Sequence, residues 1–146
     1  MSGNDRARII LHGGIVITVG LLCGLPTTVE QISGNERHWH TAHEALIMMG
    51  IWMLVASSYM DALALERRER TAFLWSLMGM GYAFAIALVL GGIANVDAFD
   101  PGHTPLHFAV FLAALAGIFG AVMTAAITIK GALAAIRAAR TGGSEP

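Results

Sequence analysis

Four long stretches without a charged residue limit the possible folds of this chain more than any other feature. They cover residues 9–25, 45–60, 71–93 and 106–129. A helix needs roughly 20 residues to cross a hydrocarbon core about 30 Å thick. The last two stretches reach that length alone, and the first two reach it with polar residues at one end. We therefore expect an all-α integral membrane bundle of four transmembrane helices, near 9–26, 40–61, 70–93 and 105–130.

The composition agrees with a surface that faces lipid. Hydrophobic residues make up 55% of the chain and charged residues only 13%, whereas a soluble domain carries about 25% charged residues. The lipid bilayer is therefore an expected partner. The net charge of -1 provides no basic surface, so nucleic acid is excluded as a partner. The single cysteine, Cys23, allows no internal disulfide and no cysteine-based metal motif.

The positive charges predict the orientation of the bundle. Eight of the nine Lys and Arg residues precede the first helix, separate the second from the third, or follow the fourth, and only Arg37 lies on the other side. Positive residues favour the cytoplasmic side of a membrane. We therefore expect a multi-pass protein of the cell membrane with both termini cytoplasmic. It should form one domain over residues 1–146, with a short cytoplasmic tail at 131–146.

Three histidines fall within residues 37–45, RHWHTAHEA, at the outer end of the second helix. His38 and His40 suit positions among the lipid headgroups. His43 should lie deeper, on a helix face shared with Ile47 and Gly50. A polar side chain at that depth is costly unless it has a partner, so we expect a functional role for His43.

The stretch HTPLH, residues 103–107, is expected to begin the fourth helix. Threonine is a good N-cap and proline suits the first helical position, so the helix should start at Thr104 and Pro105. His107 then falls in the first turn, and His103 lies in the preceding loop. His12, at the cytoplasmic end of the first helix, is expected to be an ordinary interfacial side chain.

The histidine spacings favour haem iron over zinc. His40 and Glu44 are four residues apart, as are His103 and His107, but the zinc-protease pattern H-E-x-x-H is absent. Proline within HTPLH also disfavours a continuous helix through His103. A single histidine presented inside an apolar bundle, with no second close ligand in sequence, fits haem iron better.

Small residues recur at four-residue spacing in the first and fourth helices. Gly20 and Gly24 form such a pair, and the fourth helix carries Ala113, Ala116, Gly117, Gly120 and Ala121. Small residues at this spacing let two helices approach closely. We expect them to serve packing within the bundle rather than a contact between subunits.

Residues 39–50, WHTAHEALIMMG, resemble the second helix of the styrene oxide isomerase family and of the related hydroxylaminobenzene mutases. The charged loop ERRERTAF before the third helix and the glycines within that helix are also similar. The resemblance implies a small four-helix membrane enzyme that holds haem b between the subunits of a homotrimer. It further implies that His43 is the axial ligand of the haem iron. Because His40 and His107 lie at the same membrane face as His43, we expect them also to lie near the cofactor.

The activity implied by the resemblance is a redox-neutral rearrangement of a small hydrophobic substrate. Ferric iron would act as a Lewis acid, either on an epoxide that becomes a carbonyl compound or on an aryl hydroxylamine that becomes an aminophenol. This chain departs from the family at two positions. Met49 stands where the family has an asparagine, and Leu88 where it has a tyrosine. Tyr82 and Asn95, together with Met49, are therefore the candidate residues near the substrate.

Two other functions are compatible with the residues. The first is a non-enzymatic haem protein for electron transfer or sensing, which would need two axial ligands. His43 and His107 are the best pair for that role, because the sequence puts them at similar depth. The second is a membrane scaffold without a cofactor.

Overall fold

The computed structural model describes residues 3–28 and 35–142 and confirms the expected fold class. Four long helices make up most of this part of the chain. They are α1 (Gly3–Cys23), α2 (Glu36–Tyr59), α3 (Arg67–Ala94) and α4 (Pro105–Gly142), with two short 3₁₀ turns, η1 (Pro26–Thr28) and η3 (Met60–Ala62). Each long helix has the length and composition needed to cross a membrane.

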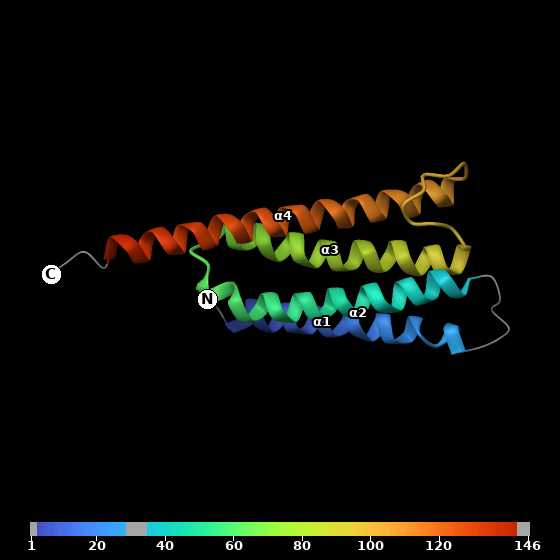
Figure 1. Cartoon of the computed structure of the whole chain (residues 1–146), viewed down its shortest axis with the longest axis horizontal. Helices are drawn as coiled ribbons and strands as arrows, with labels where there is room; N and C mark the ends of the chain where they lie inside the picture. Colours follow the sequence, from blue (N-terminus) through green and yellow to red (C-terminus); the bar gives the residue numbers. More distant parts are fainter. Residues whose placement is uncertain (1–2, 29–34, 143–146) are drawn as a thin grey trace.

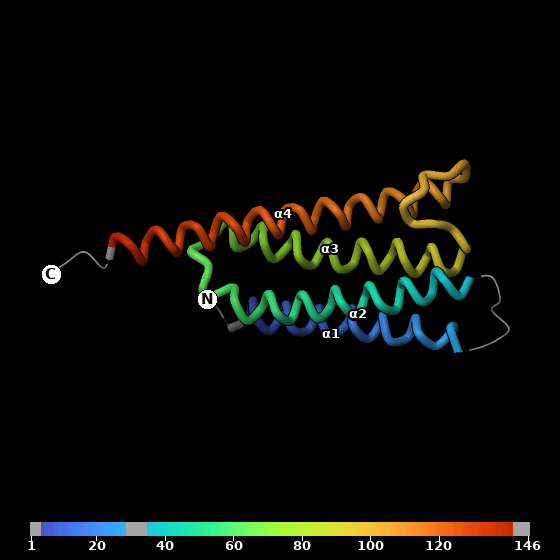
Figure 2. The backbone as a smooth tube through the Cα atoms, in the orientation of Figure 1, coloured from blue at the N-terminus to red at the C-terminus, as the bar shows by residue number. Residues whose placement is uncertain are grey.

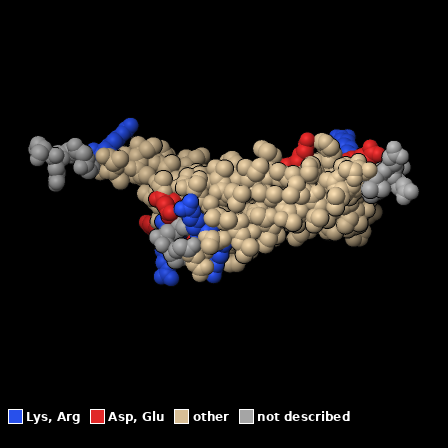
Figure 3. Space-filling model, turned by 90° about the horizontal axis from the view of Figure 1, so that it is seen from below, with Lys and Arg blue, Asp and Glu red and all other residues tan. Residues whose placement is uncertain are grey.

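The helices form two antiparallel hairpins that pack side by side (Figure 1). Helix α1 packs against α2, α4 packs against α3, and α3 joins the hairpins by contacting both α2 and α1. The start of α1, the α2–α3 connection and the end of α4 all lie at one end, which we call the basic end (Figure 2). Charged side chains gather at the two ends of the molecule and leave an uncharged belt between them (Figure 3).

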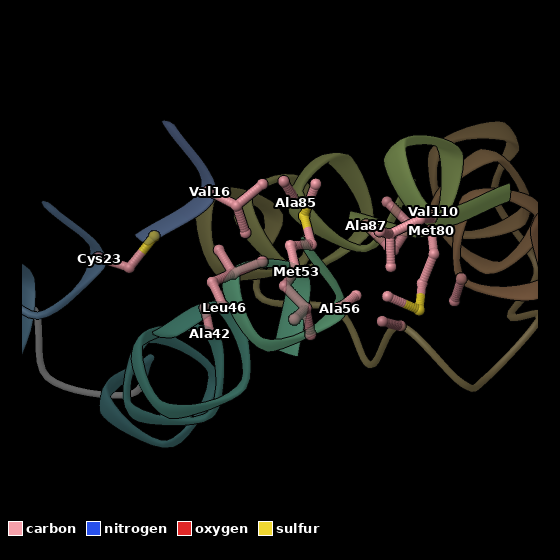
Figure 4. Close-up of a cluster of buried hydrophobic side chains, with 14 of the residues drawn as sticks. Val16, Cys23, Ala42, Leu46, Met53, Ala56, Met80, Ala85, Ala87 and Val110 are labelled. Atoms are coloured by element: carbon pink, nitrogen blue, oxygen red, sulfur yellow. The ribbon is translucent and has the colours of Figure 1, made fainter. Parts of the chain in front are cut away.

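Buried apolar side chains from all four long helices fill the centre of the bundle (Figure 4). Val16 on α1, Leu46 and Met53 on α2, and Leu77 on α3 are completely buried. The expected packing role of the small residues holds on α4, where two glycines face α3. A Cβ atom at Gly117 would lie 2.7 Å from the ring of Phe84, and one at Gly120 would lie 2.8 Å from the carbonyl oxygen of Ser76.

The observed helix ends differ from the expected ones by four residues or more in three places. Helix α1 begins at Gly3 rather than near residue 9. Helix α2 begins at Glu36 rather than near residue 40; the amide of Asn35, just before it, donates a hydrogen bond to the Gly92 carbonyl, 3.0 Å away. Helix α4 continues past Lys130 to Gly142, although the sequence suggested a tail from residue 131. Alanine, leucine and arginine dominate that segment and favour helix, so the charged residue Lys130 does not end α4.

Candidate histidine site

His43 lies in the contact between α1 and α2. Its Nδ1 atom is 2.9 Å from the carbonyl oxygen of Gly20, and the side chain is half-buried. A carbonyl oxygen only accepts hydrogen bonds, so Nδ1 must carry the proton and donate it. The neutral ring then has its free lone pair on Nε2. A polar side chain at this depth was expected to need a partner, and that partner is a backbone carbonyl of the neighbouring helix.

The two glycines of α1 create the space that the imidazole ring occupies. A Cβ atom at Gly24 would lie 2.7 Å from Nδ1 of His43 and 2.9 Å from its Cε1 atom. A Cβ atom at Gly20 would lie 2.9 Å from the backbone nitrogen of Ile47. The Gly-x-x-x-Gly spacing therefore brings α2 close to α1 and also leaves room for one particular side chain. It fixes where His43 lies and which of its nitrogens is available.

His40 lies outside this contact. Its side chain is 64% exposed, and its Nδ1 atom is 3.6 Å from a carboxylate oxygen of Glu44, one turn along α2. The spacing of four residues thus does bring these two side chains together. Within residues 3–28 and 35–142, no three His, Cys, Asp or Glu side chains gather closely enough to hold a metal ion.

His38 lines a small cavity at the same end of the bundle, between α2 and the end of α3. The cavity has a volume of about 160 Å³, and Leu88 also lines it. Leu88 is the residue that the resemblance described above puts at the family's tyrosine position. The side chain of Leu88 is buried, so it contributes an apolar group to this part of the α2–α3 contact.

His107 belongs to the cap of α4. Its Nδ1 atom lies 2.7 Å from the hydroxyl oxygen of Thr104, and its backbone N–H donates to the same oxygen at 3.2 Å. The helix begins at Pro105, so the predicted start is confirmed. Gly102, at φ +52°, lies against the side chain of His107, since a Cβ atom there would be 2.5 Å from Cγ of the ring. Because α4 packs on α3 while His43 lies between α1 and α2, one chain does not bring His43 and His107 together.

The three candidate substrate residues lie in three different places. Met49 lines an apolar groove of about 440 Å³ formed by α2, α3 and α4. The hydroxyl of Tyr82 lies 2.6 Å from Nδ1 of His12 on α1. Asn95 is exposed and ends α3 in the left-handed conformation, at φ 54°. Asparagine is one of the few residues that adopt this conformation readily, so a helix-ending role accounts for Asn95.

Tyr82 and His43 also lie at different depths. His12 precedes Gly20 by eight residues on α1, which corresponds to about 12 Å along the helix axis. The His12–Tyr82 pair therefore lies well toward the basic end from His43. The sequence analysis did not predict this pair. The available signal was that His12 is the one histidine within the first apolar stretch.

These features define a class: a four-helix membrane protein made of two hairpins, with a histidine held between the first two helices by a glycine pair. The sequence profile described as styrene oxide isomerase matches residues 5–135. The chain belongs to the styrene oxide isomerase family, and an isomerase-like function follows from that membership. No curated protein and no solved structure gives a significant match.

Proposed function

We propose that this protein is a haem b-dependent membrane isomerase that rearranges a small hydrophobic substrate without net oxidation or reduction. The observation that carries the proposal is the hydrogen bond from Nδ1 of His43 to the Gly20 carbonyl. Histidines that bind metals commonly donate their other ring nitrogen to a carbonyl or carboxylate, which fixes the tautomer and strengthens the ligating nitrogen. His43 already has this arrangement, with Nε2 left to bind iron.

The tautomer of His43 suits such a cofactor. Gly20 and Gly24 leave the space in which the imidazole is held, and the bond from Nδ1 to the Gly20 carbonyl leaves Nε2 as the ligating nitrogen. When bound, a ferric haem b would supply a Lewis acid that draws electron density from the substrate oxygen. We further propose that the cofactor is held between subunits of a homo-oligomer, a homotrimer by analogy with the family.

The residues at the family's two substrate positions favour an apolar substrate. Met49 and Leu88 carry no hydrogen-bonding group that could orient a substrate, so shape and the bond to iron would have to orient it. Apolar substrates concentrate in lipid, and the helices surrounding a membrane site exclude water, which strengthens electrostatic interactions. The two candidate reactions are conversion of an epoxide to a carbonyl compound and of an aryl hydroxylamine to an aminophenol.

The visible spectrum of the detergent-purified protein tests this proposal, after expression with sufficient haem. We expect a Soret band in the wild type that responds to added imidazole or styrene oxide. His43→Ala should lose this band and any rearrangement activity, while far-ultraviolet circular dichroism shows intact helices. The control is the double variant with His38→Gln and His40→Gln, which should keep both the spectrum and the protein yield. Haem retained with an unchanged spectrum in His43→Ala would overturn the proposal.

A cofactor-free scaffold is the second candidate, and one observation favours it. The Gly20 carbonyl satisfies His43 without any cofactor, so the depth of His43 does not by itself require iron. This alternative predicts a wild-type protein without a Soret band. It also predicts that His43→Ala mainly lowers stability, because the ring fills the space above Gly24.

A further inference from the structure

A second groove lies between α1 and α3, toward the basic end and away from His43. Its volume is about 500 Å³, within the range of roughly 300–1,000 Å³ typical of small-molecule sites. One wall is polar and belongs mainly to α1, whereas the other is apolar and belongs to α3. No residue of the proposed haem site lines it.

The polar wall leads from the end of the bundle into the membrane-spanning part. Asp5, Arg8 and His12 line the groove and follow one another at spacings of three and four residues, which puts them on one face of α1. His12 ends this row and meets Tyr82 of α3, with a distance of 2.6 Å from Nδ1 to the hydroxyl oxygen. The two rings meet edge to face, with their centroids 5.6 Å apart. Polar side chains inside a membrane span are costly and often mark functional sites.

The apolar wall contains space that the chain itself does not fill. A Cβ atom at Gly79 would have no neighbour within 4 Å, unlike the glycines that bring helices into contact. Trp75, one turn earlier on α3, is 70% exposed and also lines the groove, as does Met78. An indole beside an open glycine presents a flat apolar surface to a ligand.

We propose that this groove binds a small apolar molecule that carries one hydroxyl group. Its apolar body would lie against Trp75 and over Gly79, and its hydroxyl would bond to the His12–Tyr82 pair. A hydroxyl group suits either tautomer of His12 because it both donates and accepts. If Tyr82 donates to Nδ1, the tyrosine oxygen can accept from the ligand, and if Nδ1 donates, the tyrosine O–H can donate to it. The site requires no haem, so it goes beyond the proposed function.

Fluorine NMR of a ligand pair tests this inference on the 146-residue protein in detergent. The probes are para-fluorobenzyl alcohol and para-fluorotoluene, which differ by the hydroxyl group. Gly79→Leu fills the groove, and Gly14→Leu is a matched control, because Gly14 also has nothing within 4 Å of its Cβ position but lies on an apolar surface of α1. We expect Gly79→Leu to weaken binding of the alcohol at least tenfold and Gly14→Leu to leave it unchanged.

Tyr82→Phe tests the hydroxyl contact alone. It should weaken binding of the alcohol by about three- to tenfold, as expected for one hydrogen bond, and leave para-fluorotoluene unaffected. His43→Ala should bind both probes like the wild type, so failure here is separable from failure of the haem proposal. Equal binding in the Gly79→Leu and Gly14→Leu proteins would overturn the inference. Displacement of both probes alike by added phospholipid would assign the groove to lipid instead, and would also overturn it.

Discussion

Gly24 lies directly against the imidazole of His43, so closely that a Cβ atom there would fall 2.7 Å from Nδ1. Gly24→Ala must therefore displace the ring and break its bond to the Gly20 carbonyl. The proposed function then predicts that haem affinity falls by about 10- to 100-fold, the usual cost of losing a group that orients a metal ligand. Titration of the apoprotein with haem, followed at the Soret band, measures this. Gly14→Ala is the matched control, and equal affinities in the two variants would contradict the prediction.

His107→Ala should leave the position of the haem band unchanged. The side chain of His107 bonds to Thr104 at the start of α4, and α4 packs against α3 rather than against the α1–α2 pair. The substitution removes one exposed hydrogen bond, so only a small loss of thermal stability is expected. The measurement is the visible spectrum with and without imidazole. A large spectral change in this variant would identify His107 as an iron ligand and revive the electron-transfer alternative.

Gly120→Ala should destabilise the contact between α3 and α4. A Cβ atom at Gly120 would lie 2.8 Å from the backbone oxygen of Ser76 and 3.0 Å from the backbone nitrogen of Met80. Backbone atoms cannot move aside cheaply, so we expect the free energy of unfolding to fall by about 1–3 kcal/mol. Thermal unfolding in detergent, followed by circular dichroism, measures this.

The control for this variant is Gly79→Ala, where nothing lies within 4 Å of the added atom. Alanine has the higher helix propensity, so that variant should match the wild type or gain up to about 1 kcal/mol. Equal melting temperatures for the two alanine variants would contradict the prediction that Gly120 is needed for the close packing of α4 on α3.

Both termini should face the cytoplasm. The opposite orientation would translocate eight positive residues instead of one, against the usual bias. A reporter that is active only in the cytoplasm, fused after Pro146, should therefore be active. The same reporter inserted after Asp100, in the α3–α4 connection, should be inactive. An active reporter at Asp100 and a silent one at Pro146 would reverse the assignment.

The sequence predicted the four helices because the length of an uncharged stretch reports directly on whether a helix can cross a membrane. It also predicted the start of α4, since Thr104 and Pro105 are local signals that need no knowledge of the rest of the fold. The exposed position of His40 followed in the same way from its place near the helix end. Each of these features depends on residues within one turn or one helix.

The contacts of the site depend instead on how each helix is rotated about its axis. The partner of His43 is a backbone carbonyl 23 residues away, and every residue has a carbonyl, so no residue type marks it. Tyr82 and His12 are 70 residues apart. The hydropathy pattern does not predict that these faces of α1 and α3 are in contact. For the same reason Met49, Tyr82 and Asn95 looked equally able to reach a substrate, yet they lie in separate parts of the bundle.

The last turns of helix α4 project beyond the other three helices. Residues 131–142 add about 18 Å of helix beyond Lys130, and Figure 1 shows α4 projecting past the other helices. Arg137 then stands about 10 Å beyond Lys130 and Arg140 about 15 Å, whereas electrostatic screening acts over about 8 Å at physiological ionic strength. Both arginines therefore stand more than one screening length beyond Lys130, so their attraction to charges at the level of Lys130 is weak. The projecting part of α4 is therefore a stiff spacer that separates Arg140 from the charges near Lys130.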